Sequence, residues 1–260
     1  MSITVRPVGD LLREWRQRRR LSQPELSLNA EISARHLSFL ETGRSQPSRD
    51  MVLRLADQLD VPLRDRNILL DAAGYAAVFP ERPLDDPALR IARQAVDQVL
   101  AGHEPYPALA VDRHWTLIAS NDATRRLIAR VDATLLQPPV NVLCLALHPA
   151  GMAPRTANLG EWRAHLLARL GHQIQVSGDP VLIRLLRELR DYPAPDEAAH
   201  DVDATAFVVP FRLKTGTGIL AFLSTTTVFG TPVDITLSEL AVEAFYPADA
   251  TTAEVLRHHQ

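Results

Sequence analysis

The side chains with the clearest chemical potential lie between positions 22 and 48, where groups that bind phosphates and base edges occur at helical spacing. An arginine such as Arg35 can form two parallel hydrogen bonds to guanine, and Ala34 or Phe39 can contact a thymine methyl group. His36 can donate to a base or to a phosphate. The residues that we expect to contact duplex DNA are Gln23, Ser33, Ala34, Arg35, His36, Phe39, Arg44, Ser45 and Ser48.

Two short helices joined by a turn would position these groups. Ser22 and Glu25 have the spacing of a capping box, in which each side chain binds the backbone amide of the other residue. Ser33 can cap a second helix over about 34–42, which ends at Gly43 because glycine best tolerates the left-handed conformation after a helix. Two capped helices separated by a turn of about three or four residues are what a helix-turn-helix requires.

In a helix-turn-helix the second helix enters the major groove of DNA. Leu37 and Leu40 must face inward to hold that helix on its neighbours, so the DNA-contact residues of the helix face outward. The first helix lies across the backbone, where its amides and Gln23 can meet phosphate. Direct base reading by Gln23 and His36 stays open at this stage.

Other interpretations of the same residues exist, because any helical hairpin can carry good caps. Arg35 could be an ordinary solvated side chain, and Phe39 could belong to a core or an interface. The charge pattern favours DNA, since the first 54 residues hold ten arginines and six acidic residues, a formal charge of +4, whereas the rest carry −7. Basic side chains supply most of the non-specific affinity for nucleic acids.

The chain is expected to contain two domains. Gly74 closes the last of five predicted short helices, and residues 75–85 contain two prolines and no clean period. We therefore predict a DNA-binding domain over residues 1–74, a linker over 75–85, and a second domain over 86–260 for ligand binding and dimerisation.

The second domain mixes strand-like and helical segments. Residues 109–111 and 115–120 flank Asp112-Arg113-His114 and predict a β-hairpin. Helices are then expected to start at Asn121, Asn158 (by a capping box with Glu161) and Asp179, followed by strands over 206–213, 219–229 and about 240–246 and a short C-terminal helix. This order predicts an α+β fold, an antiparallel sheet covered on one face by helices.

A pocket between the sheet and its helices would have apolar walls and a few polar groups. The candidate walls are Trp115, Trp162, Phe207, Phe222 and Phe229, and the candidate partners for a polar or carboxylate head group are Asn121, His148, Arg155 and Arg163. Ordinary core packing is the commoner role of a buried aromatic side chain, and Arg163 could lie on the solvent face of its helix.

The N-terminal motifs resemble the XRE family of phage-repressor-like regulators. The resemblance is carried by Leu21-Ser22-Gln23, by Ile32-Ser33 and by the run from Leu37 to Arg44, and it covers residues 10–74. It implies a five-helix, lambda-repressor-like domain that binds DNA. It also implies a structural ion pair between Arg16 and Glu41, so Glu41 is not counted as a base reader.

The remainder resembles the MmyB-like ligand-binding domain found behind XRE modules. The residues that carry this likeness are Glu104 to Leu109, Trp115 with Asn121, Asn158 to Trp162, and Phe229 to Asp234. The resemblance implies a PAS-like sheet and a small effector that is apolar or acyl-like, for example a fatty-acid-like molecule.

Several other classes are disfavoured by the sequence. The usual motifs of hydrolases, zinc proteases and nucleotide-binding enzymes are missing, and Gly216 and Gly218 are better explained as a hairpin turn than as a dinucleotide loop. We therefore expect no enzyme activity, no cofactor and no metal. The lone Cys144 excludes an internal disulfide, and the apolar run over 142–147 is too short to cross a membrane, so we expect a cytoplasmic protein.

The partners follow from the predicted DNA-binding mode. One recognition helix reads only a few base pairs, so we expect a homodimer on a palindromic operator of double-stranded DNA. The alternative is a DNA-binding regulator without a ligand, used as a protein-interaction or antitoxin-like module.

Overall fold

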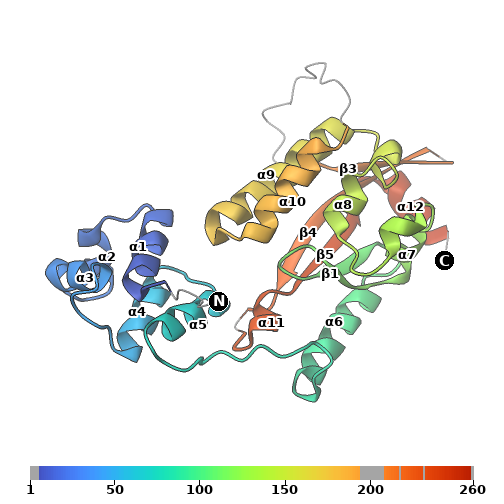
Figure 1. The fold of residues 1–260 in the computed structure, drawn as a ribbon. Helices are drawn as coiled ribbons and strands as arrows, with labels where there is room; N and C mark the ends of the chain where they lie inside the picture. Colours follow the sequence, from blue (N-terminus) through green and yellow to red (C-terminus); the bar gives the residue numbers. More distant parts are fainter. Residues whose placement is uncertain (1–5, 194–207, 217, 231, 259–260) are drawn as a thin grey trace. The chain divides into compact units, whose positions relative to one another are not determined.

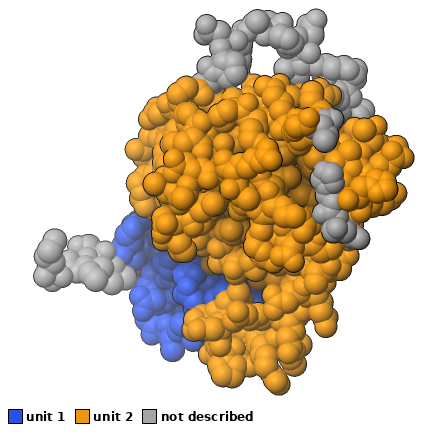
Figure 2. All heavy atoms as spheres, turned by 90° about the vertical axis from the view of Figure 1, so that its right-hand side faces the viewer, with its two compact units in different colours: residues 1–82, 175–177, 231–238 blue, residues 83–174, 178–230, 239–260 orange. Residues whose placement is uncertain are grey.

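The computed structural model describes residues 6–193, 208–216, 218–230 and 232–258. The chain divides into two compact units, coloured separately in Figure 2. The helical unit comprises residues 1–82, 175–177 and 231–238, and the sheet unit comprises residues 83–174, 178–230 and 239–260.

The five short helices predicted for the N-terminal part of the chain are present in the helical unit. They are α1 (Val8–Arg18), α2 (Gln23–Asn29), α3 (Ala34–Glu41), α4 (Arg49–Gln58) and α5 (Leu63–Ala72). The predicted capping box is confirmed, because the Glu25 amide donates to Ser22 Oγ at 3.3 Å and the Ser22 amide donates to Glu25 Oε2 at 2.7 Å. Ser33 caps α3 as predicted, and Gly43 has a φ of +69°.

The helical core brings α1 and α3 into close backbone contact. A Cβ atom added at Gly9 would lie 2.4 Å from the carbonyl oxygen of Leu40, so this position of α1 admits only glycine without a backbone shift. The largest fully buried side chains of this core are Leu12, Leu26, Leu37, Leu40, Leu55, Leu59, Leu69 and Leu70.

A short helix from the C-terminal half, α11 (Ile235–Ser238), belongs to the same unit. Ile235 is 2% exposed, and its amide donates to the carbonyl of Pro80 at 2.8 Å. The buried Asp234 carboxylate accepts a hydrogen bond from Arg82 at 3.0 Å. The helical unit is therefore assembled from segments that are far apart in the sequence.

Five strands form one sheet in the described part of the chain, in the order β2-β1-β5-β4-β3 with every neighbouring pair antiparallel (Figure 1). The strands are β1 (Ala108–Val111), β2 (Leu117–Ser120), β3 (Phe211–Thr215), β4 (Gly218–Val228) and β5 (Ala241–Pro247). The predicted α+β fold and the hairpin turn between β3 and β4 are confirmed.

The helices of the sheet unit are α6 (Arg90–Gly102), α7 (Asp122–Ile128), α8 (Val142–Leu147), α9 (Leu159–Ser177), α10 (Pro180–Asp191) and α12 (Ala250–His258). Helices α8, α9 and α10 pack on one face of the sheet, around Phe211 and Phe222. Helix α6 packs on the other face, against Ala108, Ala110 and Ala244 (Figure 1). The expectation of helices on one face only is wrong, because these small side chains make the second face of β1 and β5 apolar as well.

Three local expectations also differ from the structure. Trp115 lies in a turn before β2, not in the strand. Asn158 does not cap α9 through its side chain; instead its amide group binds Glu161, the Pro210 carbonyl and the Arg212 amide. Strand β3 begins at Phe211, because Pro210 has no N–H to donate to a strand partner.

Two further findings concern the described residues alone. No helix there is long and apolar enough to cross a membrane. No group of three or more His, Cys, Asp or Glu side chains in that part of the chain could hold a metal ion.

Candidate DNA-binding surface and ligand pocket

Helix α3 has an anchored side and an outward side. Leu37 and Leu40 are 0% and 1% exposed and pack in the helical core, as predicted. Ala34 and Arg35 are exposed, and His36 is half-buried. The outward side of α3 is thus open within the helical unit, which is the arrangement that a recognition helix needs.

The side chains of Arg35 and Arg44 both lie near the Phe39 ring on this surface. The guanidinium carbon of Arg35 lies 5.3 Å from the centre of the Phe39 ring, and that of Arg44 lies 5.9 Å from it. The Arg44 amide donates to the Phe39 carbonyl at 2.9 Å, which fixes the loop against the end of α3. A cation–π contact at an exposed site contributes about 0.5–1 kcal/mol, so the Phe39 ring favours this placement of both arginines without fixing it.

Two of the three predicted serine contacts, Ser33 and Ser48, cap helices. Ser33 Oγ accepts from the His36 amide and Ser48 Oγ accepts from the Met51 amide, and both serines remain exposed. Ser45 is half-buried, and its amide donates to the Phe39 carbonyl. These hydroxyls therefore retain a proton to donate outward.

Gln23 is tied to the ion pair that the XRE resemblance implies. Arg16 donates to Glu41 through two nitrogens, at 2.7 and 2.8 Å, so the pair is confirmed. Gln23 Nε2 donates to Glu41 Oε2 at 2.8 Å. One N–H of the Gln23 amide is thus bound within the protein, and the amide also carries a second N–H and an acceptor oxygen that can meet a ligand.

Glu41 is fully buried, whereas the Arg16 side chain is 12% exposed. Burial acts to raise the pKa of Glu41, but the hydrogen bonds from Arg16 and Gln23 and the charges of Arg16 and Arg13 outweigh it and hold the pKa below its usual value. This carboxylate fastens the end of α3 to α1 and α2, and it does not face outward.

The sheet unit contains a cavity of about 100 Å³ between the sheet and the helices on its α9 face. It is lined by Pro107, Leu109, Trp115, Leu117, Thr124, Leu127, Ile128, Val142, Leu143, Leu145, Ala146, Met152, Trp162, Leu166, Arg169, Phe211, Phe222, Ser224, Glu243 and Phe245. Three of the sequence-predicted walls, Trp115, Trp162 and Phe222, line this cavity. Its walls are predominantly apolar, as in small-molecule sites generally.

Two other predicted pocket residues lie elsewhere, and a third is not described. Phe229 packs in the cluster on the α6 face. Asn121 is buried and structural: its side chain caps α7, accepts from the Ala108 amide and donates to the Tyr106 carbonyl. Phe207 lies outside the described residues.

The predicted cationic anchors Arg155 and Arg163 are bound to backbone carbonyls and are not among the residues that line the cavity. Arg155 donates to the Leu127 carbonyl at 3.1 Å. Arg163 donates to the carbonyls of Leu189 and Arg190 at the end of α10. The His148 ring packs edge-to-face on Tyr192, with 5.0 Å between ring centres. The structure does not bring these three residues together with the aromatic walls.

Sequence reasoning missed the two charged residues that line the cavity. Arg169 donates to both carboxylate oxygens of Glu243, at 2.9 and 2.6 Å, and its guanidinium lies 4.6 Å from the centre of the Trp115 ring. Both residues carried a usable signal. Arg169 follows Trp162 by two helical turns and shares its face of α9, and Glu243 interrupts an otherwise apolar strand.

Trp115 reaches the cavity from a strained turn. Its φ of +67° is an uncommon conformation for a bulky residue. The Asp112 carboxylate accepts from the amides of His114 and Thr116, which closes the turn around Trp115. The indole Nε1 donates to Gln173 Oε1 at 2.9 Å. Strain of this kind persists only where the surroundings over-determine it.

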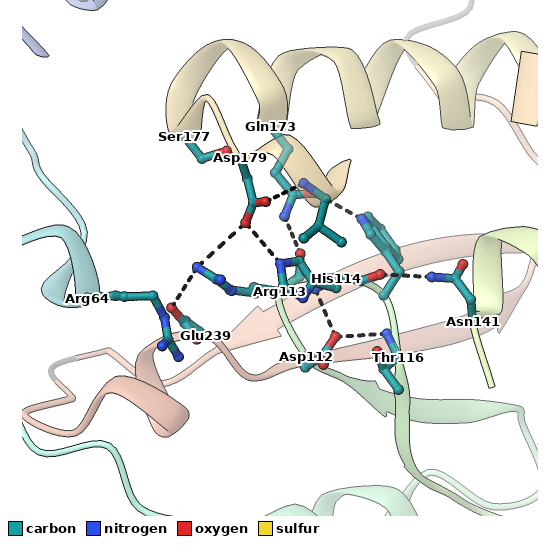
Figure 3. A network of polar contacts seen from close by, with 12 residues as sticks. Arg64, Asp112, Arg113, His114, Thr116, Asn141, Gln173, Ser177, Asp179 and Glu239 are labelled. Atoms are coloured by element: carbon teal, nitrogen blue, oxygen red, sulfur yellow. Dashed lines mark hydrogen bonds and ion pairs between the residues drawn. The ribbon is translucent and has the colours of Figure 1, made fainter. Parts of the chain in front are cut away.

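A polar network fastens this turn to α9 and α10 (Figure 3). His114 Nε2 and Asp179 Oδ2 lie 2.9 Å apart, Gln173 donates to the Arg113 carbonyl, and Asn141 donates to the His114 carbonyl. Burial acts to raise the pKa of Asp179, but the hydrogen bonds from His114 and the Val181 amide and the charge of Arg113 hold it below its usual value. The network keeps the indole at the cavity wall.

Comparison with known proteins matches both units to families. The model of the MmyB-like transcription regulator ligand binding domain matches residues 92–258, and the model of a helix-turn-helix domain matches residues 7–69. An HTH-type transcriptional regulatory protein of Methanoculleus marisnigri (strain ATCC 35101 / DSM 1498 / JR1) is 30% identical over 131 residues, which cover 48% of this chain and 41% of that protein.

A second relative is the uncharacterized HTH-type transcriptional regulator RghRB of Bacillus subtilis (strain 168), 37% identical over 76 residues, covering 29% of this chain and 52% of that protein. The chain thus spans about half the length of the curated relatives that it matches. Among solved structures, a variant of RsLOV aligns with a TM-score of 0.30 at 11% identity, over 64% of this chain and 77% of that one.

The family match covers the sheet unit with its cavity, and the helix-turn-helix match covers the helical unit with its outward α3. These families are regulatory and point to a non-enzymatic role. The chain belongs to the MmyB-like transcription regulators, with a helix-turn-helix DNA-binding domain followed by the ligand-binding domain of that family.

Proposed function

We propose that this regulator binds a specific palindromic operator as a homodimer through α3, and that a small, predominantly apolar effector in the sheet-unit cavity changes its affinity for DNA. The observation that carries the first part is the cluster of Arg35, Phe39 and Arg44 on the outward side of a helix anchored by Leu37 and Leu40. The effector part rests on the apolar cavity.

The two arginines of the cluster have different roles in this proposal. Arg35, in the first turn of α3, would read guanine in the major groove, and Ala34 beside it would contact a thymine methyl group. Arg44, in the loop after α3, would bind phosphate, together with the amides at the start of α2. Base contacts give specificity, whereas phosphate contacts give affinity for any duplex.

An electrophoretic mobility shift assay with the DNA upstream of its own gene tests this division. Arg35→Ala should reduce the ratio of specific to non-specific binding, costing about 1–3 kcal/mol at the operator. Arg44→Ala should weaken binding to all sequences and reduce the salt dependence. Arg93→Ala, which removes an exposed arginine of α6 in the other unit, is the matched control. Equal losses on every DNA with both variants of the cluster would contradict the assignment.

Signalling from the cavity has a covalent route to the helical unit. Strands β4 and β5 both line the cavity, through Phe222 and Glu243 among others, and the chain between them contains α11, which belongs to the helical unit. An effector that shifts these strands would therefore act on α11. A ligand can shift the equilibrium only by its difference in affinity for the DNA-bound and free states.

Two measurements test the dimer and the coupling. Native mass spectrometry of protein purified from its host reports the subunit count and any retained small molecule. Titration of that molecule with and without operator DNA should give different dissociation constants. A monomer on DNA, or equal constants in the two titrations, would refute the corresponding part of the proposal.

A further inference from the structure

We propose that the cavity selects an uncharged effector, an apolar chain with a hydroxyl, carbonyl or ester head, and discriminates against carboxylates. This inference rests on the proposed effector binding and narrows its chemical class. It departs from a fatty-acid-like effector, because the groups that would receive a carboxylate are already neutralised within the protein.

The charges at the cavity wall cancel. Among the lining residues that the structure describes, the charged side chains are Arg169 and Glu243. Both carboxylate oxygens of Glu243 are bound, since Arg169 donates to each and the Thr226 hydroxyl donates to Oε1 at 2.9 Å. The Arg169 guanidinium also lies over the Trp115 ring. The cavity therefore presents a closed ion pair, not a free cation.

A carboxylate ligand could enter this site in two ways, and both are unfavourable. If the carboxylate formed an ion pair with Arg169, it would displace Glu243. The Glu243 side chain is only 5% exposed, so a buried anion would be left without a compensating charge. If it lay beside the pair, it would bring a second negative charge close to Glu243 at low dielectric. A neutral head avoids both costs.

The neighbouring basic residues do not offset the cost of binding a carboxylate. Arg155 and Arg163 donate to backbone carbonyls and are not among the lining residues. His165 stacks on Trp162 with 5.3 Å between ring centres, and burial together with the charge of Arg169 lowers its pKa below the usual value. Both effects favour the neutral form of the His165 ring.

A neutral head finds hydrogen-bonding groups in the cavity. Ser224 lies on β4 among the lining residues, opposite Phe245 of β5. The Ser224 hydroxyl can donate to a carbonyl or accept from a hydroxyl. The apolar chain of the effector would lie against the surrounding walls, which include Phe211 and Phe222.

Isothermal titration of the full-length protein at pH 7.5 with 1-octanol and octanoate tests the selection, because the two probes share a chain and differ in the charge of the head. We expect 1-octanol to bind at least about tenfold more tightly. The comparison is repeated with 1-decanol and decanoate. Octanoate or decanoate binding as tightly as its alcohol overturns the inference while leaving effector binding in place. Failure of all four probes to bind folded protein contradicts the proposed effector binding itself.

Substitutions at Arg169 and Glu243 test whether this ion pair causes the preference for the alcohol over the carboxylate. Glu243→Gln removes the compensating charge, so Arg169 should become available and the preference should shift toward octanoate by about tenfold or more. Glu254→Gln, an exposed change on α12, is the matched control and should keep the preference for the alcohol. If Glu243→Gln fails to fold, the double variant Arg169→Met with Glu243→Met replaces the pair by apolar groups and should still bind 1-octanol. An unchanged preference in Glu243→Gln, or loss of 1-octanol binding by the folded double variant, overturns the role of the pair.

Discussion

Removal of Arg16 is expected to destabilise the packing of α3 in the helical unit. In Arg16→Met the fully buried Glu41 loses both charged hydrogen bonds and keeps only that of Gln23 and the weaker interaction with Arg13 at 3.7 Å. Breaking one side of a buried ion pair costs about 3–5 kcal/mol, because the remaining charge stays buried without compensation. Since the Arg16 side chain is itself 12% exposed, we expect the lower end, about 3 kcal/mol.

Hydrogen exchange of the α3 amides measures this cost locally, which matters because a chain of two units need not melt in one transition. A loss of about 3 kcal/mol corresponds to exchange about a hundredfold faster over residues 34–41. Arg13→Ala is the control, because its partner is more distant and its side chain is 42% exposed, and it should change exchange by less than about 1 kcal/mol. Exchange within about threefold of the unmodified protein in Arg16→Met would refute the reasoning.

The pH dependence gives a second check of the same ion pair. In the unmodified protein the pKa of Glu41 lies below its usual value of 4.5, so the stability that it contributes is complete above pH 4.5 and is lost as the pH falls through the lowered pKa. In Arg16→Met, burial should instead raise that pKa. The variant should therefore be closest to the unmodified protein in acid, and a deficit that grows as the pH falls would contradict this.

Three further measurements test the packing and the chemistry of single residues. Gly9→Ala should destabilise the helical unit by about 1–3 kcal/mol in urea unfolding, because the new Cβ would meet the Leu40 carbonyl, whereas Gly102→Ala meets no atom within 4 Å and should be neutral. Asn121→Ala should cost at least about 2 kcal/mol in the same assay, since buried amides and carbonyls lose their partner, and an unchanged urea midpoint would contradict its structural role. Burial raises the pKa of the Cys144 thiol to about 11, so its reaction with a disulfide reagent at pH 8 should be far slower than that of a free thiol; rapid stoichiometric reaction would show that the thiol is accessible and ionised.

The helix-turn-helix could be predicted from the sequence because its signals are local. Ser22 with Glu25, Ser33 and Gly43 each act within four residues of their own position, and the structure places all of them as expected. The outward and inward sides of α3 followed from the same helical period. Interactions of this range are encoded in consecutive residues and require no knowledge of the tertiary structure.

The cavity could be predicted only in part, because its polar end is formed by distant segments. Arg169 and Glu243 are 74 residues apart in the sequence, and no local pattern pairs them. Arg163 adjoins Trp162 in the sequence, but adjacent residues of a helix point in different directions, whereas Arg169 shares the Trp162 face. The β-propensity of Trp115 predicted a strand, and the Asp112 carboxylate overrides it by closing a turn.

The contribution of α11 limits how freely this regulator can be divided or recombined. A gene fragment that stops at residue 82 would encode α3 but would omit Ile235, which is 2% exposed, and would leave Arg82 without Asp234. A chimaera that joins these N-terminal helices to another sensor would carry the same defect unless residues 232–238 were transplanted with them. Shuffling at the obvious interdomain junction is therefore expected to yield poorly folded hybrids, so the two parts of this protein are constrained to evolve together.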